Sequence, residues 1–230
     1  MKKINFVTNN KIEFLIENKA NCVSLIQGIA DDCIFVTIPA VGFQWRLLNV
    51  GDTVECVYYA DNGSLYMFDA QILYRLVENI PLYKISFPKT YKRIQRRDFV
   101  RAPVYVPVLY RRETSKANDT RHMLRERSPD EIEDLFEGTW QRASTLDLSG
   151  GGMKLCTKTP LEADTNLITI IRDDELEVAV KGRVIRCRKH VGLKVNYHSG
   201  IKFIGIHETI QDKIISYIFE KIRQMSKREI

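Results

Sequence analysis

Two short motifs in the second half of the chain carry residues that could do chemistry. The first is RRDFVR, in which Arg97 and Arg101 are four positions apart. The planar guanidinium group of arginine donates paired hydrogen bonds that match the oxygens of a phosphate. The same donors match the O6 and N7 edge of guanine, and the flat face of the group can stack on a base. A solvated basic segment at a domain boundary is the alternative interpretation of this motif.

The second motif is DLSGGG, in which Asp147, Ser149 and Gly152 fit the pattern D-x-S-x-x-G. The carboxylate of Asp147 can accept hydrogen bonds from N1 and N2 of guanine, and the hydroxyl of Ser149 can donate or accept. Three successive glycines lose much backbone conformational entropy on folding, so we expect a structural or functional reason for the absence of side chains there. At Gly151 and Gly152 a planar base could approach the main chain without a Cβ in the way. A glycine-rich turn between strands is the alternative.

The elements that must position these motifs are predicted to be mainly β. In residues 1 to about 88, runs such as DCIFVTIPA and a hairpin turn at Asp61–Gly63 predict five or six strands in a small antiparallel barrel. In the second half, FVRAPVYVPVLY is expected to be one edge strand, because of its prolines, and further β-branched runs follow. We therefore expect two small antiparallel β-barrels in tandem, with domains at 1–90 and 91–230.

Helices are expected at two places in the second domain. The polar stretch at about 111–141 is too long for a hairpin loop. Within it, Ser128, Pro129 and Glu131 form a capping-box start, and Gly138 a stop, so we expect one short helix in an otherwise mobile loop.

A C-terminal helix is predicted at about 209–226, with Thr209 and Asp212 as a capping box. Its apolar residues recur at helical spacing, so one stripe should pack on the second barrel. The residues of this stripe are Ile210, Ile214, Ile218 and Ile222, widened by Ile215 and Phe219.

Together, the two motifs resemble those of the PilZ domain family, whose members are receptors for the bacterial second messenger cyclic di-GMP. Arg97 and Arg101 match R-x-x-x-R, and the glycine-rich motif matches D-x-S-x-x-G. The first half resembles the N-terminal domain of YcgR-type flagellar brake proteins. The resemblance implies two β-barrels with the ligand at their junction, gripped by the arginines on one side and by the Asp/Ser/Gly turn on the other. The 111–141 segment is longer than the connection expected in this family.

The resemblance also gives a role to Arg96, which directly precedes the arginine motif. An arginine there resembles the type that binds two stacked ligand molecules, whereas an apolar residue goes with one. A solvent-facing linker charge is the alternative. The predicted cofactor is thus cyclic di-GMP, at two molecules per chain and with no metal. The predicted ligand-binding residues are Arg96, Arg97, Arg101, Asp147, Ser149, Gly151 and Gly152.

Composition limits the function classes. The net charge of +6 favours anionic partners. No apolar run approaches the length of a membrane span, and no apolar region follows the first lysines as in a signal peptide. The five cysteines are far apart and form no CxxC pair, so we interpret them as reduced core residues. These features predict a cytoplasmic protein, with recruitment to the flagellar basal body as a further expectation.

We do not expect an enzyme, because the four histidines are scattered and no phosphate loop or nucleophile elbow is present. A single-stranded nucleic-acid-binding barrel is the alternative function. Such barrels need exposed aromatic platforms, whereas Tyr105, Tyr110 and Phe203 lie in apolar runs and are expected to be core. The favoured interpretation is a cyclic di-GMP receptor that changes its inter-domain orientation on binding and regulates flagellar motility through a stator or rotor protein.

Overall fold

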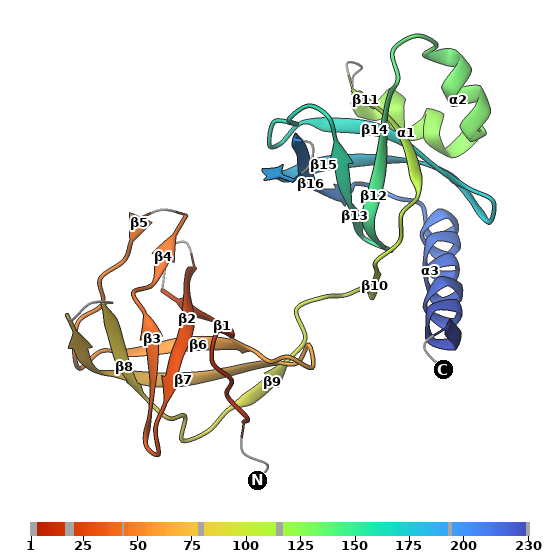
Figure 1. The fold of residues 1–230 in the computed structure, drawn as a ribbon. Coiled ribbons are helices and arrows are strands. Elements are labelled where there is room, and N and C mark those ends of the chain that lie inside the picture. The colour runs from red at the N-terminus through yellow and green to blue at the C-terminus, as the bar shows by residue number, and fades with distance from the viewer. Residues whose placement is uncertain are drawn as a thin grey trace. The chain divides into compact units, whose positions relative to one another are not determined.

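The computed structural model describes residues 4–16, 21–42, 44–77, 81–113, 117–192 and 195–228. The chain divides into two compact units, Met1–Arg96 and Arg97–Ile230. Each unit contains a closed six-stranded antiparallel barrel, and the second also carries a C-terminal helix (Figure 1). The predicted fold class, two small antiparallel β-barrels in tandem with a helix after the second, is confirmed.

The barrel of the first unit has the strand order β1-β6-β7-β8-β3-β2 and closes because β2 pairs back with β1. Along β2 every second side chain is buried, as the two-residue period of a strand requires. The short β4 and β5 extend from β2, and β9 pairs with β7. The strands are β1 (Lys11–Leu15), β2 (Cys22–Ile29), β3 (Cys33–Thr37), β4 (Ala40–Val41), β5 (Gln44–Trp45), β6 (Thr53–Tyr59), β7 (Leu65–Leu76), β8 (Leu82–Ser86) and β9 (Lys92–Ile94).

The barrel of the second unit has the strand order β12-β11-β14-β15-β16-β13 and closes because β13 pairs with β12. A further short strand, β10, adds to β12. The core of this barrel is formed by alternate residues of these strands together with one face of the C-terminal helix. The strands are β10 (Arg101–Ala102), β11 (Pro107–Arg112), β12 (Gln141–Ser149), β13 (Gly152–Thr157), β14 (Asn166–Asp173), β15 (Leu176–Val191) and β16 (Val195–Phe203).

The single strand predicted for FVRAPVYVPVLY is wrong, because the run forms β10 and β11 with a break between them. In the break, the buried hydroxyl of Thr145 donates to the carbonyl of Val104 at 2.6 Å and accepts from the N–H of Val106 at 2.9 Å. A side chain therefore takes over hydrogen bonds that a strand partner would otherwise make.

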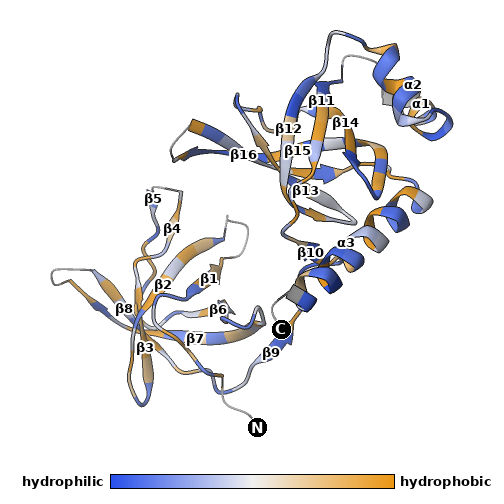
Figure 2. Ribbon diagram, turned by 45° about the vertical axis from the view of Figure 1, so that its right-hand side comes forward, coloured by the Kyte–Doolittle hydropathy of each residue, from blue (hydrophilic) through white to orange (hydrophobic). Residues whose placement is uncertain are grey.

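The C-terminal helix, α3 (Glu208–Arg228), packs on the second barrel through the buried Ile214, Tyr217 and Ile218. Figure 2 shows hydrophobic and hydrophilic residues alternating around it. The predicted Thr209–Asp212 capping box is wrong, because the helix begins at Glu208 and the carbonyl of His207 already accepts hydrogen bonds from the N–H groups of Ile210 and Gln211. Phe219 does not join the packed stripe, since 45% of it is exposed.

The 111–141 segment forms two helices, α1 (Ala117–Glu126) and α2 (Pro129–Leu135), where one helix in a mobile loop was expected. Residues 114–116 lie outside the described part. The predicted capping box of α2 is confirmed, since the Ser128 hydroxyl accepts from the Glu131 N–H and the Glu131 carboxylate accepts from the Ser128 N–H. The two helices pack on the outer side of β14 and β15 through a small apolar cluster centred on Ile132, Ile168, Ile170 and Ala179.

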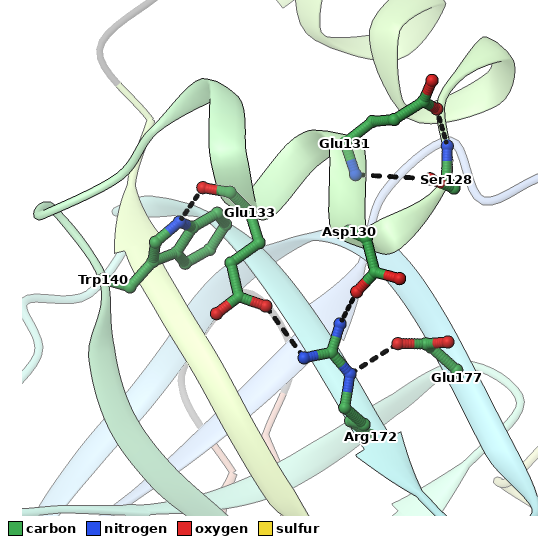
Figure 3. A network of polar contacts seen from close by, with 7 residues as sticks. All are labelled: Ser128, Asp130, Glu131, Glu133, Trp140, Arg172 and Glu177. Carbon is green, nitrogen blue, oxygen red and sulfur yellow. Dashed lines mark hydrogen bonds and ion pairs between the residues drawn. The ribbon is translucent and has the colours of Figure 1, made fainter.

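An arginine on β14 fixes α2 to the barrel (Figure 3). The Arg172 guanidinium contacts Asp130 and Glu133 of α2 at 2.6 and 2.8 Å and Glu177 of β15 at 2.5 Å. The indole N–H of Trp140 donates to the carbonyl of Glu133 at 2.9 Å, which closes the segment back onto β12. In the described part of the insertion, α1 and α2 therefore cover one side of the barrel.

Candidate functional site

The end of β12 brings the two predicted motifs together within the second unit. Arg101 pairs with Ser149, and Ala102 pairs with Leu148. Ala102 and Leu148 are fully buried in the core. Because successive strand residues point to opposite faces, Arg101 and Ser149 lie on the other face, and Asp147, two residues before Ser149, shares it. Arg101 of the arginine motif and the D-x-S-x-x-G motif therefore meet on one outer face of this barrel.

The side chains of this face differ in exposure. Arg101 is exposed, and Asp147 is partly buried. Arg97, which lies before β10, is also exposed. Ser149 is only 5% exposed, and its hydroxyl donates to the carbonyl oxygen of Gly152 at 2.9 Å. A hydroxyl has one proton, so in this geometry Ser149 closes the turn and keeps only acceptor capacity for a ligand.

The three glycines have separate structural reasons. A Cβ on Gly152 would lie 2.2 Å from the carbonyl oxygen of Ile201, so β13 and β16 could not approach as they do. A Cβ on Gly150 would lie 2.8 Å from both Ile215 and Phe99, and one on Gly151 would lie 3.0 Å from Phe99. Strand packing and the ring of Phe99 thus account for the bare backbone, and ligand contacts of Gly151 and Gly152 stay a prediction.

Arg96, the remaining predicted site residue, belongs to the first unit, whereas Arg97 belongs to the second. Its Nη1 atom lies 2.7 Å from Oε2 of Glu13 and 3.0 Å from the hydroxyl of Tyr59. The predicted site residues are therefore divided between the two units. The alternative interpretation of Arg96 as a purely solvated charge does not hold, since an acidic partner anchors it.

A group of cations that the motif search missed lies on the same face as Asp147. Lys154 pairs with Asp147, Gly200 with Lys154, and Arg186 with Gly200. The Nε atom of Arg186 is 3.4 Å from the point where a Cβ of Gly200 would be, so the Arg186 side chain lies over that glycine. In the next row, Lys202 and Arg183 follow Gly152. The sequence signal was available: no Asp or Glu occurs between Glu177 and Glu208.

The aromatic residues confirm the expected core with one exception. Tyr110 and Phe203 are buried, at 3% and 6% exposure, but Tyr105 is 75% exposed. Val104 and Val106 point into the core, so alternation turns Tyr105 outward. The expectation that Tyr105 is core was therefore wrong.

Other features do not coincide with the motifs. A cavity of about 220 Å³, lined by Leu124, Val180 and Ile206 among others, includes none of the predicted site residues. Over the described ranges, no cluster of three or more His, Cys, Asp or Glu could hold a metal ion. In the same ranges, no helix has the length and apolar character needed to cross a membrane.

Comparison with known proteins gives matches to both halves of the chain. No curated protein sequence matches it. Two family models do: one described as flagellar protein YcgR matches residues 7–88, and the PilZ domain matches residues 95–220. The second match contains both the R-x-x-x-R and the D-x-S-x-x-G motifs.

Solved structures share this two-barrel fold. The Bacillus subtilis inhibitor of motility, MotI/DgrA, has a TM-score of 0.72 at 18% identity, over 98% of this chain and 100% of that one. Escherichia coli YcgR, solved in complex with c-di-GMP, has a TM-score of 0.51 at 11% identity, over 96% of this chain and 87% of that one. MrkH of K. pneumonia, a c-di-GMP-dependent transcription regulatory factor, has a TM-score of 0.53 at 16% identity, over 93% and 85%. Because the PilZ model matches more than half of the 230 residues, this chain belongs to the PilZ domain family, with a YcgR-type domain before it.

Proposed function

We propose that this protein is a cytoplasmic receptor for cyclic di-GMP that regulates flagellar motility. The observation that carries the proposal is the pairing of Arg101 with Ser149, with Asp147 on the same face. This pairing supports the proposal because it sets a cation suited to phosphate beside an acceptor suited to guanine. Membership of the PilZ domain family and the c-di-GMP complex of YcgR support the choice of ligand.

Each side chain has a role that its chemistry allows. Arg97 and Arg101 donate forked hydrogen bonds to phosphate oxygens or to the O6 and N7 edge of guanine. Asp147 accepts from N1 and N2 of a guanine, and Ser149 accepts through its free lone pair. Lys154, opposite Asp147, adds positive potential that favours a ligand with two phosphates. No step in this scheme breaks a covalent bond, so we propose a sensor and not an enzyme.

The output follows from where the arginines lie in the chain. Arg96 and Arg97 are consecutive but belong to different units. A ligand that holds both residues fixes the backbone between them, and it shifts the inter-domain equilibrium toward the state that it binds more tightly. The proposed partner is a stator or rotor protein of the flagellar motor. The YcgR-type domain and the likeness to an inhibitor of motility support this partner.

Calorimetric titration with cyclic di-GMP tests the proposal. We expect two molecules per chain for the wild type and at least about tenfold weaker binding for Arg101→Ala, since a bidentate contact contributes about 1–3 kcal/mol. Arg142→Ala removes an exposed arginine from the other end of β12 and should bind as the wild type does. Cyclic di-AMP, which lacks the guanine donors, should bind weakly. Wild-type affinity in Arg101→Ala, or equal binding of both dinucleotides, would contradict the proposed site.

Single-strand nucleic-acid binding stays the second candidate, because Tyr105 is exposed and the face around Lys154, Arg186 and Lys202 is cationic. A salt titration separates the two functions. Polynucleotide affinity should fall steeply as salt rises, because each neutralised phosphate releases counterions. Cyclic di-GMP, held by hydrogen bonds and stacking, should lose much less affinity over the same range.

A further inference from the structure

The arginine before the R-x-x-x-R motif is fixed to the first barrel by two side chains. Both contacts of Arg96, to the Glu13 carboxylate at 2.7 Å and to the Tyr59 hydroxyl at 3.0 Å, use its Nη1 atom. Glu13 lies on β1 and Tyr59 at the end of the neighbouring β6. The anchor of Arg96 is therefore built from the wall of the first barrel and not from the linker.

The anchoring carboxylate is itself well enclosed. The side chain of Glu13 is 11% exposed, and Val57, opposite it on β6, is fully buried. Burial acts to raise the pKa of the Glu13 carboxyl, but hydrogen bonds from its three neighbours outweigh burial and hold the pKa below 4.5. Glu13 is thus ionised at neutral pH and needs cationic partners, which are Arg96 and Lys11.

The geometry leaves one edge of the Arg96 guanidinium available. Nη1 carries two N–H groups, and Glu13 and Tyr59 take both. The Nε and Nη2 atoms have no acceptor among the described residues, and the side chain is 33% exposed. These two atoms form the parallel fork that binds a phosphate bidentately. The anchor therefore fixes the guanidinium while keeping its phosphate-binding edge open.

We infer that Glu13 and Tyr59 are positioning residues that make Arg96 the ligand contact of the first barrel, an inference that rests on the proposed function. Through them, a phosphate held by Arg96 is held by β1 and β6, while Arg97 and Arg101 hold the same ligand cluster for the second barrel. Without these two contacts the Arg96 guanidinium is not fixed to the first barrel. A phosphate bound to Arg96 would then not be held in place relative to that barrel. The pair thereby decides both the binding of the second ligand molecule and its effect on inter-domain distance.

Four variants of the full chain test this inference: Glu13→Ala, Glu13→Gln, Tyr59→Phe and the matched control Glu55→Gln. The readouts are the number of cyclic di-GMP molecules per chain by calorimetry and the ligand-induced change in fluorescence transfer between a probe on each unit. Glu13→Ala should weaken the second molecule at least about tenfold and abolish the distance change, with the first molecule bound as in the wild type. Glu13→Gln keeps an acceptor for Nη1 and should restore part of both effects. Glu55→Gln neutralises an exposed carboxylate on β6 and leaves Glu13, Tyr59 and Arg96 unchanged, so it should behave as the wild type.

The outcomes separate the inference from the proposed function. A wild type that binds no cyclic di-GMP overturns the proposed function. A wild type that binds two molecules, with Glu13→Ala and Tyr59→Phe unchanged in both readouts, overturns the inference alone. Arg96→Ala with wild-type stoichiometry also overturns it. Circular dichroism checks each fold, and if Glu13→Ala does not fold, Tyr59→Phe, which removes a single hydroxyl, decides.

Discussion

Arg101 and Ser149 form a directly opposed pair where β10 joins the end of β12. Only one further pair, Ala102 with Leu148, supports this short strand. These two residue pairs and the ring of Phe99, which lies against Gly150 and Gly151, hold the arginine motif against the glycine turn. The buried Ala102 anchors the strand to the core. The site is therefore tied to the barrel at Arg101, and changes in the turn should reach the arginine.

Replacing Ser149 with alanine should weaken the turn. The variant loses the hydrogen bond from the hydroxyl to the Gly152 carbonyl, which costs about 1 kcal/mol of folding stability. Urea unfolding of the second unit measures the change. Ser144→Ala, on the same strand and only partly buried, serves as the control. Equal stability of the two variants would show that the Ser149 hydroxyl does not support the turn.

Alanine substitutions should distinguish Gly152 from Gly151. The new Cβ at Gly152 would meet the Ile201 backbone oxygen at 2.2 Å, and backbone in a paired strand cannot easily move. We expect Gly152→Ala to destabilise the barrel by about 1–3 kcal/mol or more. At Gly151 the nearest atoms belong to the ring of Phe99, which can shift, so the loss should be smaller. Thermal unfolding of both variants gives the comparison, and a larger loss for Gly151→Ala would contradict it.

Asp173 should make the attachment of α3 sensitive to acid. The hydrogen bond from Tyr217 is the main cause that lowers the pKa of Asp173 below its ordinary 3.8, and Lys221 contributes. A carboxyl whose pKa is lower in the folded state adds stability above its unfolded pKa, and this stability is lost as the pH falls through the folded value. The loss should therefore occur below about pH 4.

Asp173→Asn should remove this part of the acid sensitivity. Its unfolding free energy should be lower than that of the wild type at pH 7, and the difference should shrink at pH 3. Asp212→Asn, exposed on α3, is the control. An unchanged difference between the two pH values would exclude Asp173 as the source.

Arg172→Gln should loosen α2 without unfolding the barrel. The Arg172 side chain is 40% exposed, so its three ion pairs together should contribute only about 1 kcal/mol. Faster amide hydrogen exchange in Pro129–Leu135, with exchange in β14 unchanged, is the expected result. Arg183→Gln, on the neighbouring β15 but away from α2, is the control. Equal protection of α2 in both variants would mean that apolar packing alone holds the insertion.

The sequence predicted features that depend on local spacing. Alternating runs indicated the barrels, and the capping box of Ser128 and Glu131 located α2, since both signals lie within a few residues. Strand alternation around the buried Val104 and Val106 also predicts that Tyr105 points outward. Its apolar neighbours instead led to the expectation that Tyr105 is core. Helix α1 was missed because few of its residues are apolar; of its described side chains, Met123 and Leu124 pack on the apolar cluster under the insertion.

The parts that could not be predicted depend on residues far apart in the chain. A Cβ on Gly152 would meet the Ile201 carbonyl oxygen on another strand, and this packing reason for the glycine does not follow from the motif. The break between β10 and β11 depends on the Thr145 hydroxyl in the same way. The contact between Arg96 and Glu13 has no counterpart in the local sequence.

The two barrels have separate cores, the first drawn from residues between Ile4 and Tyr91 and the second from residues between Ala102 and Ile222. Each barrel should therefore melt as its own cooperative unit, and a heat scan should contain two transitions in place of a single midpoint. A ligand raises the midpoint of whatever folded unit it binds. Heat scans with and without cyclic di-GMP therefore show which barrel binds the ligand. A ligand that contacts both Arg96 and Arg97 should raise the midpoint of both transitions.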